Sequence, residues 1–316
     1  RKFRPFNSKS CNMMTRNLRF AALLLLAGVF EAAPAVQGAR PGKKKAQTVR
    51  LMDYNIADGM WYDQYNRYDR FVAWVRTQDP DVFAICEGAT HWNEHKKTVS
   101  KEQMPRYLPD SLHLLAERWG HPYTAIGPYQ DNYPVAFTSK YPIEVVQRIG
   151  EGLSHGALHV KINGVNYVVL HLWPQRYSMG DKTRKDNGGE AFRVEEMRRI
   201  LDATILNPKF AGEKHWLMMG DFNSHSPLDK PFHGTRNYDV HDLVRSAYSH
   251  DIVGDWFSGE FVPSTTGGKA RIDFIYCTDG IWDGVKRVET VHDAFTDKAS
   301  DHRPIVVEFR TPKKTK

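Results

Sequence analysis

The chain has 316 residues, of which 41% are hydrophobic, enough for one large domain or two small ones with a sizeable core. Its formal net charge is +7, but the first 39 residues hold six of the 44 Lys and Arg and only one of the 37 acids. The rest of the chain is therefore close to neutral, which excludes a global electrostatic argument for nucleic-acid binding.

The first 39 residues are expected to consist of upstream residues and a secretory signal peptide. A basic stretch at 14–19 precedes the apolar run at 20–30, and small residues lead to Ala35 and Ala39. This order is typical of a signal with cleavage after one of those alanines, and the run is shorter than the about 18 residues expected of a membrane-spanning helix. Residues 1–12, before the first Met, are expected to lie upstream of the start. We expect export to the periplasm or extracellular space, without stable membrane insertion after cleavage.

After a basic linker at 40–47, residues 48–316 show the alternation typical of a single α/β domain. Amphipathic helical patterns occupy 67–78, 109–120 and 189–206. Several of the apolar runs are hydrophobic on both alternating faces, which is typical of strands covered on both sides. We expect central sheets with helices outside them. The expected strands span 48–56, 81–87, 134–139, 156–162, 166–173, 215–223, 271–277 and 303–309.

The cysteines leave one question open. Cys86 and Cys277 follow the signal, and each ends an apolar run. Export permits a disulfide between them, but two buried, unpaired thiols fit the pattern equally well.

Polar side chains fall where the predicted strands end. They are Asn55, Glu87, His171, Asp221, Asn223, Asp273 inside the run at 271–277, and the pair Asp301 and His302 before the last run. One such residue is usually a capped or solvated group. Strand ends of a layered α/β protein meet along one edge, however, so this many predict one shared site.

The residue types in this set fit metal-assisted hydrolysis of a phosphate ester. Carboxylates and an amide without cysteine suit a hard cation such as Mg²⁺ or Mn²⁺. Two imidazoles can act as base and acid. Asp273 would be a costly lone charge in an apolar strand, so we expect it within hydrogen-bond reach of His302. Asp221 and Asn223, two apart in an extended segment, are expected to project to the same side, with Gly220 letting the chain leave the strand.

The motifs resemble those of the endonuclease/exonuclease/phosphatase superfamily, which has the DNase I-like fold. They are YNI at 54–56, CE at 86–87, HLW at 171–173, GDFN at 220–223, RIDFIY at 271–276 and SDHRPI at 300–305. The resemblance spans about residues 49–310. It implies a four-layer α/β sandwich, in which two packed central β-sheets are flanked by helices, and a divalent-metal-dependent phosphoric ester hydrolase.

The resemblance also implies a role for each position. Glu87 would hold the metal, with Asn55 and Asp301 nearby. Asp221 and Asn223 would contact the scissile phosphate and position the attacking water. His302 would act as the base or stabilise the phosphorane, and Asp273 would orient the His302 ring. His171 would be a phosphate ligand or the leaving-group acid.

Substrate-binding residues are expected around this set. His155 is either a phosphate contact or an ordinary loop histidine, and His159 is the weaker candidate. Asp131 and Asn132 are candidates to orient His171, and Asn132 is also a candidate substrate contact. Two loops, at 88–110 and 173–190, carry basic and aromatic residues, including Trp173 and Arg176 in the second. They suit a nucleic acid, a lipid head group or a phosphorylated sugar.

The substrate class stays open at this stage. The leading hypothesis is a secreted, monomeric, nuclease-like phosphodiesterase, with a phosphomonoesterase as a variant of it. The first alternative is a phospholipase C- or sphingomyelinase-like head-group hydrolase. The second is a non-catalytic binding protein on the same fold, which is disfavoured because every matching catalytic position holds the expected residue type.

Overall fold

The computed structural model describes residues 47–88, 112–128, 130–131, 133–233, 237–258, 262–268 and 270–311. The predicted signal and most of the linker lie outside these residues, as do Asn132 and most of the loop at 88–110. In the described part, no helix is long and apolar enough to cross a membrane.

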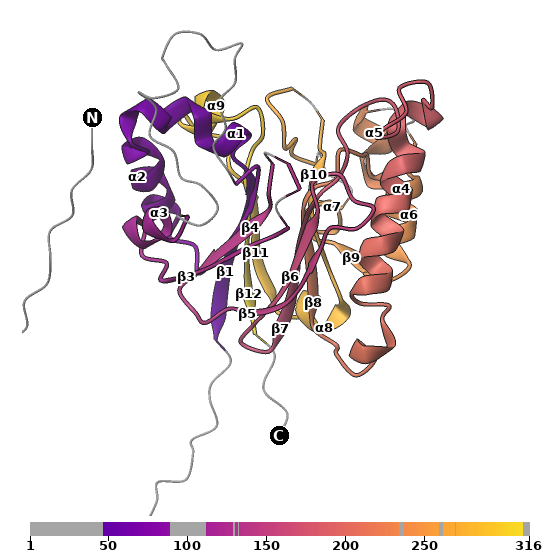
Figure 1. Cartoon of the computed structure of the whole chain (residues 1–316). Helices are drawn as coiled ribbons and strands as arrows, with labels where there is room; N and C mark the ends of the chain where they lie inside the picture. The colour runs from indigo at the N-terminus through magenta and orange to yellow at the C-terminus, as the bar shows by residue number, and fades with distance from the viewer. Residues whose placement is uncertain are drawn as a thin grey trace, which may run out of the picture. The chain divides into compact units, whose positions relative to one another are not determined.

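Two six-stranded sheets lie face to face in the middle of the domain (Figure 1). The first has the spatial order β11 (Val285–Thr290), β12 (Ile305–Arg310), β1 (Thr48–Asn55), β2 (Val82–Cys86), β4 (Ala136–Ser139) and β3 (Tyr123–Ile126). The second has the order β5 (Glu144–Ile149), β6 (Ala157–Ile162), β7 (Val165–His171), β8 (Trp216–Asp221), β10 (Asp273–Cys277) and β9 (His250–Asp251). Only β1–β2 and β7–β8 pair in parallel among these strands.

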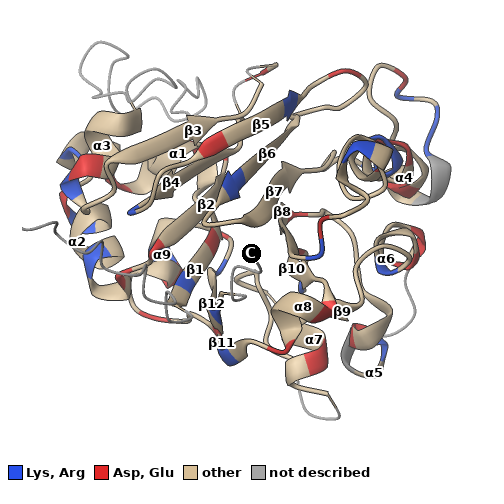
Figure 2. Ribbon diagram, turned by 90° about the horizontal axis from the view of Figure 1, so that it is seen from below, with Lys and Arg blue, Asp and Glu red and all other residues tan. Residues whose placement is uncertain are grey.

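Helices cover the outer face of each sheet, α2 and α3 on the first and α4 and α6 on the second (Figures 1 and 2). The α-helices are α1 (Ala57–Met60), α2 (Asp69–Gln78), α3 (Leu112–Arg118), α4 (Asp186–Ala203), α5 (Lys230–His233), α6 (Asp239–Arg245), α7 (Ile252–Trp256), α8 (Asp279–Trp282) and α9 (Thr296–Ala299). The short 3-10 helices are η1 (Trp61–Asn66), η4 (Pro208–Phe210) and η5 (Pro227–Asp229). Basic and acidic segments are interspersed on α2 and α4 in Figure 2.

Side-chain alternation along the strands builds the layers. In β1, Leu51 joins the cluster between the sheets, whereas Met52 joins the cluster beneath α2. In β8, Met219 faces the other sheet and Met218 packs with α4. Both faces of these strands are buried, which is why their sequences read as nearly continuous apolar runs.

The expected four-layer α/β sandwich is confirmed, and eight of its strands begin or end near the predicted limits. The sequence patterns missed β3, β5, β9 and β11, which lie at sheet edges or are short. Edge strands such as β5 are partly exposed, so their apolar signal is weak. Cys86 and Cys277 are both buried and free, so the two thiols do not form a disulfide.

Candidate active site

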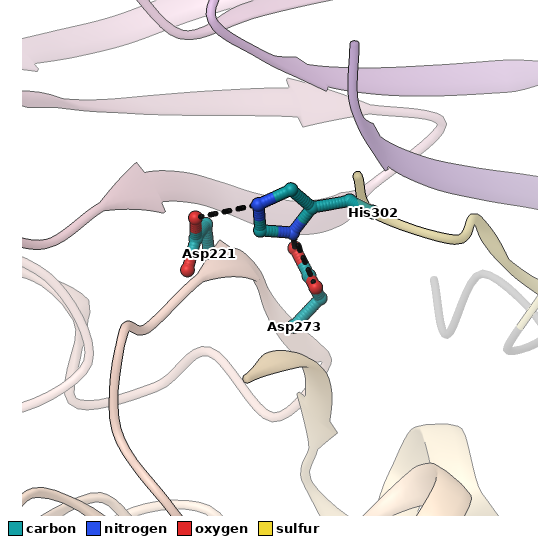
Figure 3. A group of neighbouring side chains, drawn as sticks. All are labelled: Asp221, Asp273 and His302. Carbon is teal, nitrogen blue, oxygen red and sulfur yellow. Dashed lines mark hydrogen bonds and ion pairs between the residues drawn. The ribbon is translucent and has the colours of Figure 1, made fainter. Parts of the chain in front are cut away.

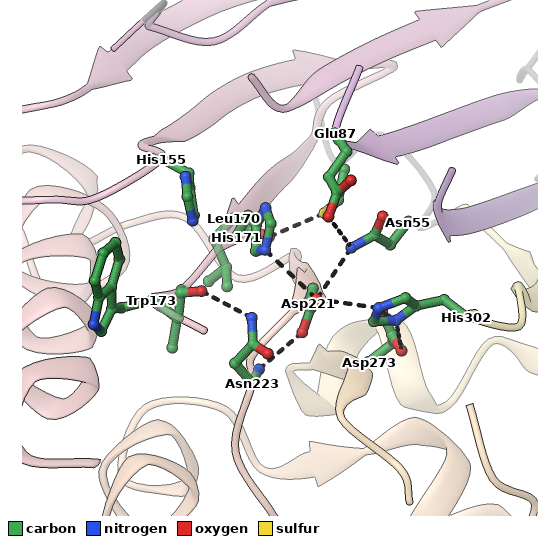
Figure 4. Close-up of polar contacts among 12 residues, drawn as sticks. Asn55, Glu87, His155, Leu170, His171, Trp173, Asp221, Asn223, Asp273 and His302 are labelled. Carbon is green, nitrogen blue, oxygen red and sulfur yellow. Dashed lines mark hydrogen bonds and ion pairs between the residues drawn. The ribbon is translucent and has the colours of Figure 1, made fainter. Parts of the chain in front are cut away.

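Three adjacent strands of the second sheet present polar side chains at one edge. In the strand register, His171 of β7 lies beside Asp221 of β8, and Asp273 of β10 lies on the other side of Asp221. Across the interface, β1 ends at Asn55 and Glu87 follows β2. Figure 4 shows these side chains turned toward Asp221 from both sheets.

Gly220 lets the strands approach closely beside Asp221. A Cβ atom at this position would lie 1.9 Å from the carbonyl oxygen of Leu170, and the φ of Gly220 is +128°. We expected Gly220 to release the chain from the strand, but β8 continues through Asp221. Only glycine fits here, because the lack of a side chain allows β7 to lie close to β8 next to the site.

His302 lies between two buried carboxylates (Figure 3). Its Nδ1 donates to Asp273, 2.8 Å from Oδ2, so the expected hydrogen bond is present, and its Nε2 lies 3.6 Å from Oδ2 of Asp221. Burial alone would lower the pKa of His302, but the charges of Asp273 and Asp221 outweigh it and raise the pKa well above its ordinary value. These two charges therefore favour the protonated ring.

Besides His302, three residues contact the carboxylate of Asp221. Asn55 Nδ2 donates to its Oδ2 across 3.1 Å, His171 Nε2 lies 3.5 Å from the same oxygen, and the backbone N–H of Asn223 donates to its Oδ1 across 2.9 Å. Burial raises the pKa of Asp221 strongly, His302 opposes the rise, and the charge of Asp273 adds to it. This carboxyl group thus titrates closer to neutral pH than an ordinary aspartate.

Asn223 faces the site differently from our expectation. Its backbone is left-handed, with φ +48°, so it has already left the extended strand that ends at Asp221. Its Nδ2 donates to the carbonyl of Leu172 across 2.9 Å. Asn223 therefore ties the end of β8 to the segment that follows His171.

His171 and His155 form a stacked pair. Their ring centroids lie 4.3 Å apart at an interplanar angle of 29°, and the ring of Trp173 lies 6.2 Å beyond His155. Asp131, which we expected to orient His171, instead forms a hydrogen bond with Nδ1 of His155. Burial, with help from His155 and His302, lowers the pKa of His171 well below its ordinary value, so its ring is neutral at pH 7.

Of the three predicted metal ligands, Asn55 and Glu87 are in contact, with Nδ2 of Asn55 3.2 Å from Oε1 of Glu87. Oδ1 of Asn55 accepts from the backbone N–H of Ala57 across 3.1 Å, so the amide acts as a donor toward the carboxylates. The Asp301 carboxylate is 84% exposed and lies 4.0 Å from Nε2 of His302.

The donor set fits a hard divalent cation. Oxygens of the buried Asp221 and Asp273 carboxylates and a ring nitrogen of His302 lie within 4.8 Å of one another, and Asn55 connects this group to the Glu87 carboxylate. Burial raises the pKa values of Glu87 and Asp53, and the charges of neighbouring acids raise them further. A bound cation would compensate this concentration of buried acids.

The remaining candidate substrate contacts lie outside this cluster. Arg176 is exposed, Trp173 is half-buried, and Asn132 lies outside the described residues. Trp173 donates from its indole to the carbonyl of Tyr177 within the loop at 173–190. Buried Arg193 supports the same loop, since its guanidinium donates to the carbonyl of Trp173 across 3.0 Å.

Sequence reasoning missed two buried groups that hold the site, Glu196 and Ser300, and one buried acid near it, Asp53. Glu196 on α4 accepts from the N–H of Ser154 (2.7 Å) and from that of Trp173 (2.9 Å), which fixes the two segments that carry His155 and His171. Ser300 donates to the carbonyl of Asn55 (2.8 Å) and accepts from the N–H of His302 (3.0 Å). Asp53, whose Oδ1 is buried without a hydrogen-bond partner, lies two residues before Asn55. Of these groups, only Glu196 had a signal in the sequence, because it is an acid on the apolar face of a helix.

Comparison with known proteins agrees with this fold. Residues 55–302 match the model of the Endonuclease/Exonuclease/phosphatase family. Among solved structures, an AP endonuclease from Archaeoglobus fulgidus is 14% identical with a TM-score of 0.57, over 83% of this chain and 99% of that one. The human nocturnin catalytic domain is 16% identical with a TM-score of 0.53, over 86% of this chain and 99% of that one.

A 3′-5′ exonuclease from Neisseria meningitidis is 14% identical with a TM-score of 0.51, over 82% of this chain and 99% of that one. At these identities the likeness shows the fold alone. No curated protein sequence matches the chain.

Proposed function

This chain belongs to the endonuclease/exonuclease/phosphatase family, and we propose that it is a divalent-metal-dependent phosphoesterase that hydrolyses phosphodiester bonds. The observation that carries the proposal is the position of Asp221. Its carboxylate lies against a protonated His302 on one side and a neutral His171 on another, with Asn55 donating to it. Such a set of groups can handle both the proton and the charge of an in-line attack on phosphorus.

The pKa directions support one assignment of the proton positions. Asp221 has a raised pKa, so it is a base suited to near-neutral pH, and it takes the proton from the attacking water. His302 keeps its proton because Asp273 and Asp221 hold it. The imidazolium then stabilises the negative charge that accumulates on the phosphorane oxygens, and Asp273 fixes the ring through Nδ1.

His171 and His155 lie on the other side of Asp221. As a neutral ring, His171 donates a hydrogen bond rather than a full proton to a phosphate oxygen, which favours a phosphate ligand over a leaving-group acid. The Nε2 of His155 and the Nδ1 of His171 are buried without a protein hydrogen-bond partner. These two atoms support the assignment of both rings to the substrate phosphate, since a buried ring nitrogen is costly without a partner.

Glu87, Asn55 and Asp301 are proposed to hold the cation, which we infer is Mg²⁺ or Mn²⁺. When bound, it would neutralise charge on the phosphate. Asn55 would turn its oxygen toward the ion or keep its present role as a donor between Glu87 and Asp221.

The cellular setting of this activity rests on the sequence pattern. We propose that residues 1–39 comprise upstream residues and a signal peptide, that 40–47 form a linker, and that 48–316 are the catalytic domain. The mature enzyme would act as a monomer in the periplasm or outside the cell on phosphate esters, including nucleic acid. Trp173 and Arg176 are proposed to contact the substrate from the loop at 173–190, and Asn132 from its place before β4.

A panel of phosphate esters tests the proposed function. The mature domain, given Mg²⁺ or Mn²⁺, is assayed on DNA, RNA, sphingomyelin, phosphoinositides and phosphomonoesters. We expect turnover of phosphodiesters in nucleic acid. Turnover of lipid alone would favour a head-group hydrolase over the nuclease-like function. No turnover of any ester would favour a non-catalytic binding protein.

A further inference from the structure

A buried ion pair near the start of α4 lies behind the segments that carry several site residues. Glu190 is 2% exposed and Arg193 is 7% exposed, and Nε of Arg193 lies 3.0 Å from Oε2 of Glu190. Taking two charges out of water is costly, so a buried pair of this kind adds little stability by itself. Its role is therefore judged from the other contacts that the two side chains make.

Arg193 closes the base of the loop that starts at Trp173. Its Nη1 donates to the carbonyl of Trp173 across 3.0 Å and to that of Gln175 across 3.4 Å, and its Nη2 donates to the carbonyl of Gly188 across 3.0 Å. Gly189 has φ +86°, and a Cβ atom there would lie 2.1 Å from the carbonyl oxygen of Gln175. The two ends of the loop thus meet closely, and the planar fork of one guanidinium holds both of them.

Glu190 holds the segment that follows Asn223. Its Oε1 accepts from the hydroxyl of Ser224 across 2.6 Å and from the N–H of Val240, in α6, across 3.3 Å. The Ser224 side chain is fully enclosed, since the residue is 1% exposed. Because Glu190 also bonds to Arg193, the pair connects the chain that leaves β8 to the chain that leaves β7.

These contacts close a ring around the ends of β7 and β8. On the side of the site, Nδ2 of Asn223 donates to the carbonyl of Leu172 across 2.9 Å, and the N–H of Leu172 donates to the carbonyl of Asp221 across 2.9 Å. On the side of α4, the ion pair completes the ring. His171 directly precedes Leu172, and its Nε2 lies 3.5 Å from Oδ2 of Asp221. A shift of either strand end would therefore change the position of the His171 ring relative to Asp221.

We propose that the Glu190–Arg193 pair positions the His171 ring relative to Asp221, through the backbone that follows each of these two residues. The inference rests on the proposed function, in which His171 binds the substrate phosphate. A displacement of about 1 Å in such a site can lower the rate about 10²-fold. Glu190 and Arg193 act through other groups, so they are positioning residues, and the wall that carries His171 is fixed before the substrate binds.

Hydrogen exchange tests this positioning without turnover. Arg193→Lys keeps the charge of the pair, but a compact ammonium group cannot span the carbonyl groups that the guanidinium fork reaches. We expect the amides of Leu172 and Asn223, which both bond to Asp221, to exchange at least tenfold faster in this variant. The amides of β1 and β12 should keep their rates. Unchanged exchange at both amides, or faster exchange only within α4, would overturn the proposal.

Two further variants make the exchange measurement specific. Arg198→Lys is the matched control, because Arg198 is an exposed arginine on the same helix, and it should leave the exchange rates unchanged. Glu190→Gln combined with Arg193→Met removes both charges at similar volume, a change that buried pairs often tolerate. This double variant keeps the test valid if Arg193→Lys lowers global stability. It should show the same local increase, and its absence would contradict the proposal.

Kinetics separate positioning from a loss of folded protein. A smaller folded fraction lowers kcat and leaves KM unchanged, whereas a displaced phosphate ligand weakens substrate binding. On bis-p-nitrophenyl phosphate, we expect Arg193→Lys to raise KM at least fivefold. The acidic limb of the pH profile should stay in place, because Asp273 still holds His302. A lower kcat at unchanged KM would contradict a positioning role.

The two measurements also separate this inference from the proposed function. If the wild-type protein cleaves no ester and the exchange rates change as expected, the hydrolase is contradicted and the positioning of His171 is supported. If the wild-type protein cleaves phosphodiesters and Arg193→Lys changes neither exchange nor KM, the hydrolase stands and the positioning is contradicted.

Discussion

Asn55, at the end of β1, donates a hydrogen bond across 3.1 Å to Asp221, at the end of β8. These strands belong to different sheets, so this buried bond joins the two halves of the sandwich at the site. It also favours the ionised form of Asp221, against the burial that raises the pKa of this carboxyl group. The amide thus has a structural and an electrostatic role.

Asn55→Ala should therefore shift the pH dependence of activity. Loss of the donor raises the pKa of Asp221 further, so we expect the acidic limb of the kcat/KM profile to move to higher pH and kcat at neutral pH to fall about 10-fold or more. Asn66→Ala is the control, because Asn66 also donates to an aspartate, Asp63, away from the site. Identical pH profiles for Asn55→Ala and wild type would show that the bond does not tune Asp221.

Asp273→Asn tests what holds the proton on His302. Asp273 is the leading contributor that raises the pKa of His302 against burial. Its neutralisation should bring this pKa down and make the ring neutral at a lower pH, which NMR titration of the imidazole measures directly. Activity should fall by about 10²-fold or more as the charge and the ring orientation are lost. An unchanged imidazole pKa would contradict the assigned role of Asp273.

Stability should depend on pH and metal in a linked way. The pKa of Asp221 is raised to about 7, so between about pH 4 and pH 7 the folded state binds more protons than the unfolded state. Unfolding free energy then falls as pH rises, and the raised pKa of His302 acts in the same direction above about pH 6.5.

In EDTA, Tm should be lower at pH 8 than at pH 6.5, a range in which histidines with a lowered pKa, such as His171, contribute little to the pH dependence. Mg²⁺ should restore more of the loss at pH 8, since it binds ionised carboxylates. Asp221→Asn should flatten the dependence, as followed by circular dichroism. A Tm in EDTA that rises toward pH 8 would show that other groups dominate.

Glu196→Ala tests the support beneath the two stacked histidines. It removes the acceptor of three donors, the N–H and Oγ of Ser154 and the N–H of Trp173, and should destabilise the fold by about 2–4 kcal/mol in urea unfolding. Glu195→Ala is the matched control on the same helix. Glu195 is half exposed and pairs with Arg184 at the surface, which is worth about 1 kcal/mol or less. Equal effects of the two substitutions would contradict the buried role of Glu196.

The sequence predicted most of the architecture because both faces of the central strands are buried. It also predicted the convergence of Asn55, Glu87, His171, Asp221, Asp273 and His302, since polar residues at strand ends share one edge in this topology. It could not predict how these groups pair. Asp131 bonds to His155 rather than His171, and Asn223 bonds to the chain after His171. These hydrogen-bond partners depend on the backbone turns after the strands.

The supporting residues could not be predicted from the sequence for a similar reason. Ser300 and Glu196 act through bonds to backbone groups that are far away in the sequence, such as the carbonyl of Asn55 and the N–H of Trp173. A pattern of residue types does not encode such partners. Gly220 is the clearest case: it resembles a turn residue, but its place inside β8 follows from the approach of Leu170 on the neighbouring strand.

The central claim, that Asp221 and the His302–Asp273 pair hydrolyse a phosphodiester with a divalent cation, is tested most directly with bis-p-nitrophenyl phosphate. We expect steady release of p-nitrophenol by the wild-type domain in Mg²⁺ or Mn²⁺, loss of that release in EDTA, and a drop of about 10²-fold or more in His302→Ala. His292→Ala, which alters an exposed histidine bonded to the Ser264 carbonyl, should keep full activity. Equal rates for His302→Ala and wild type, or hydrolysis that survives EDTA, would contradict the account.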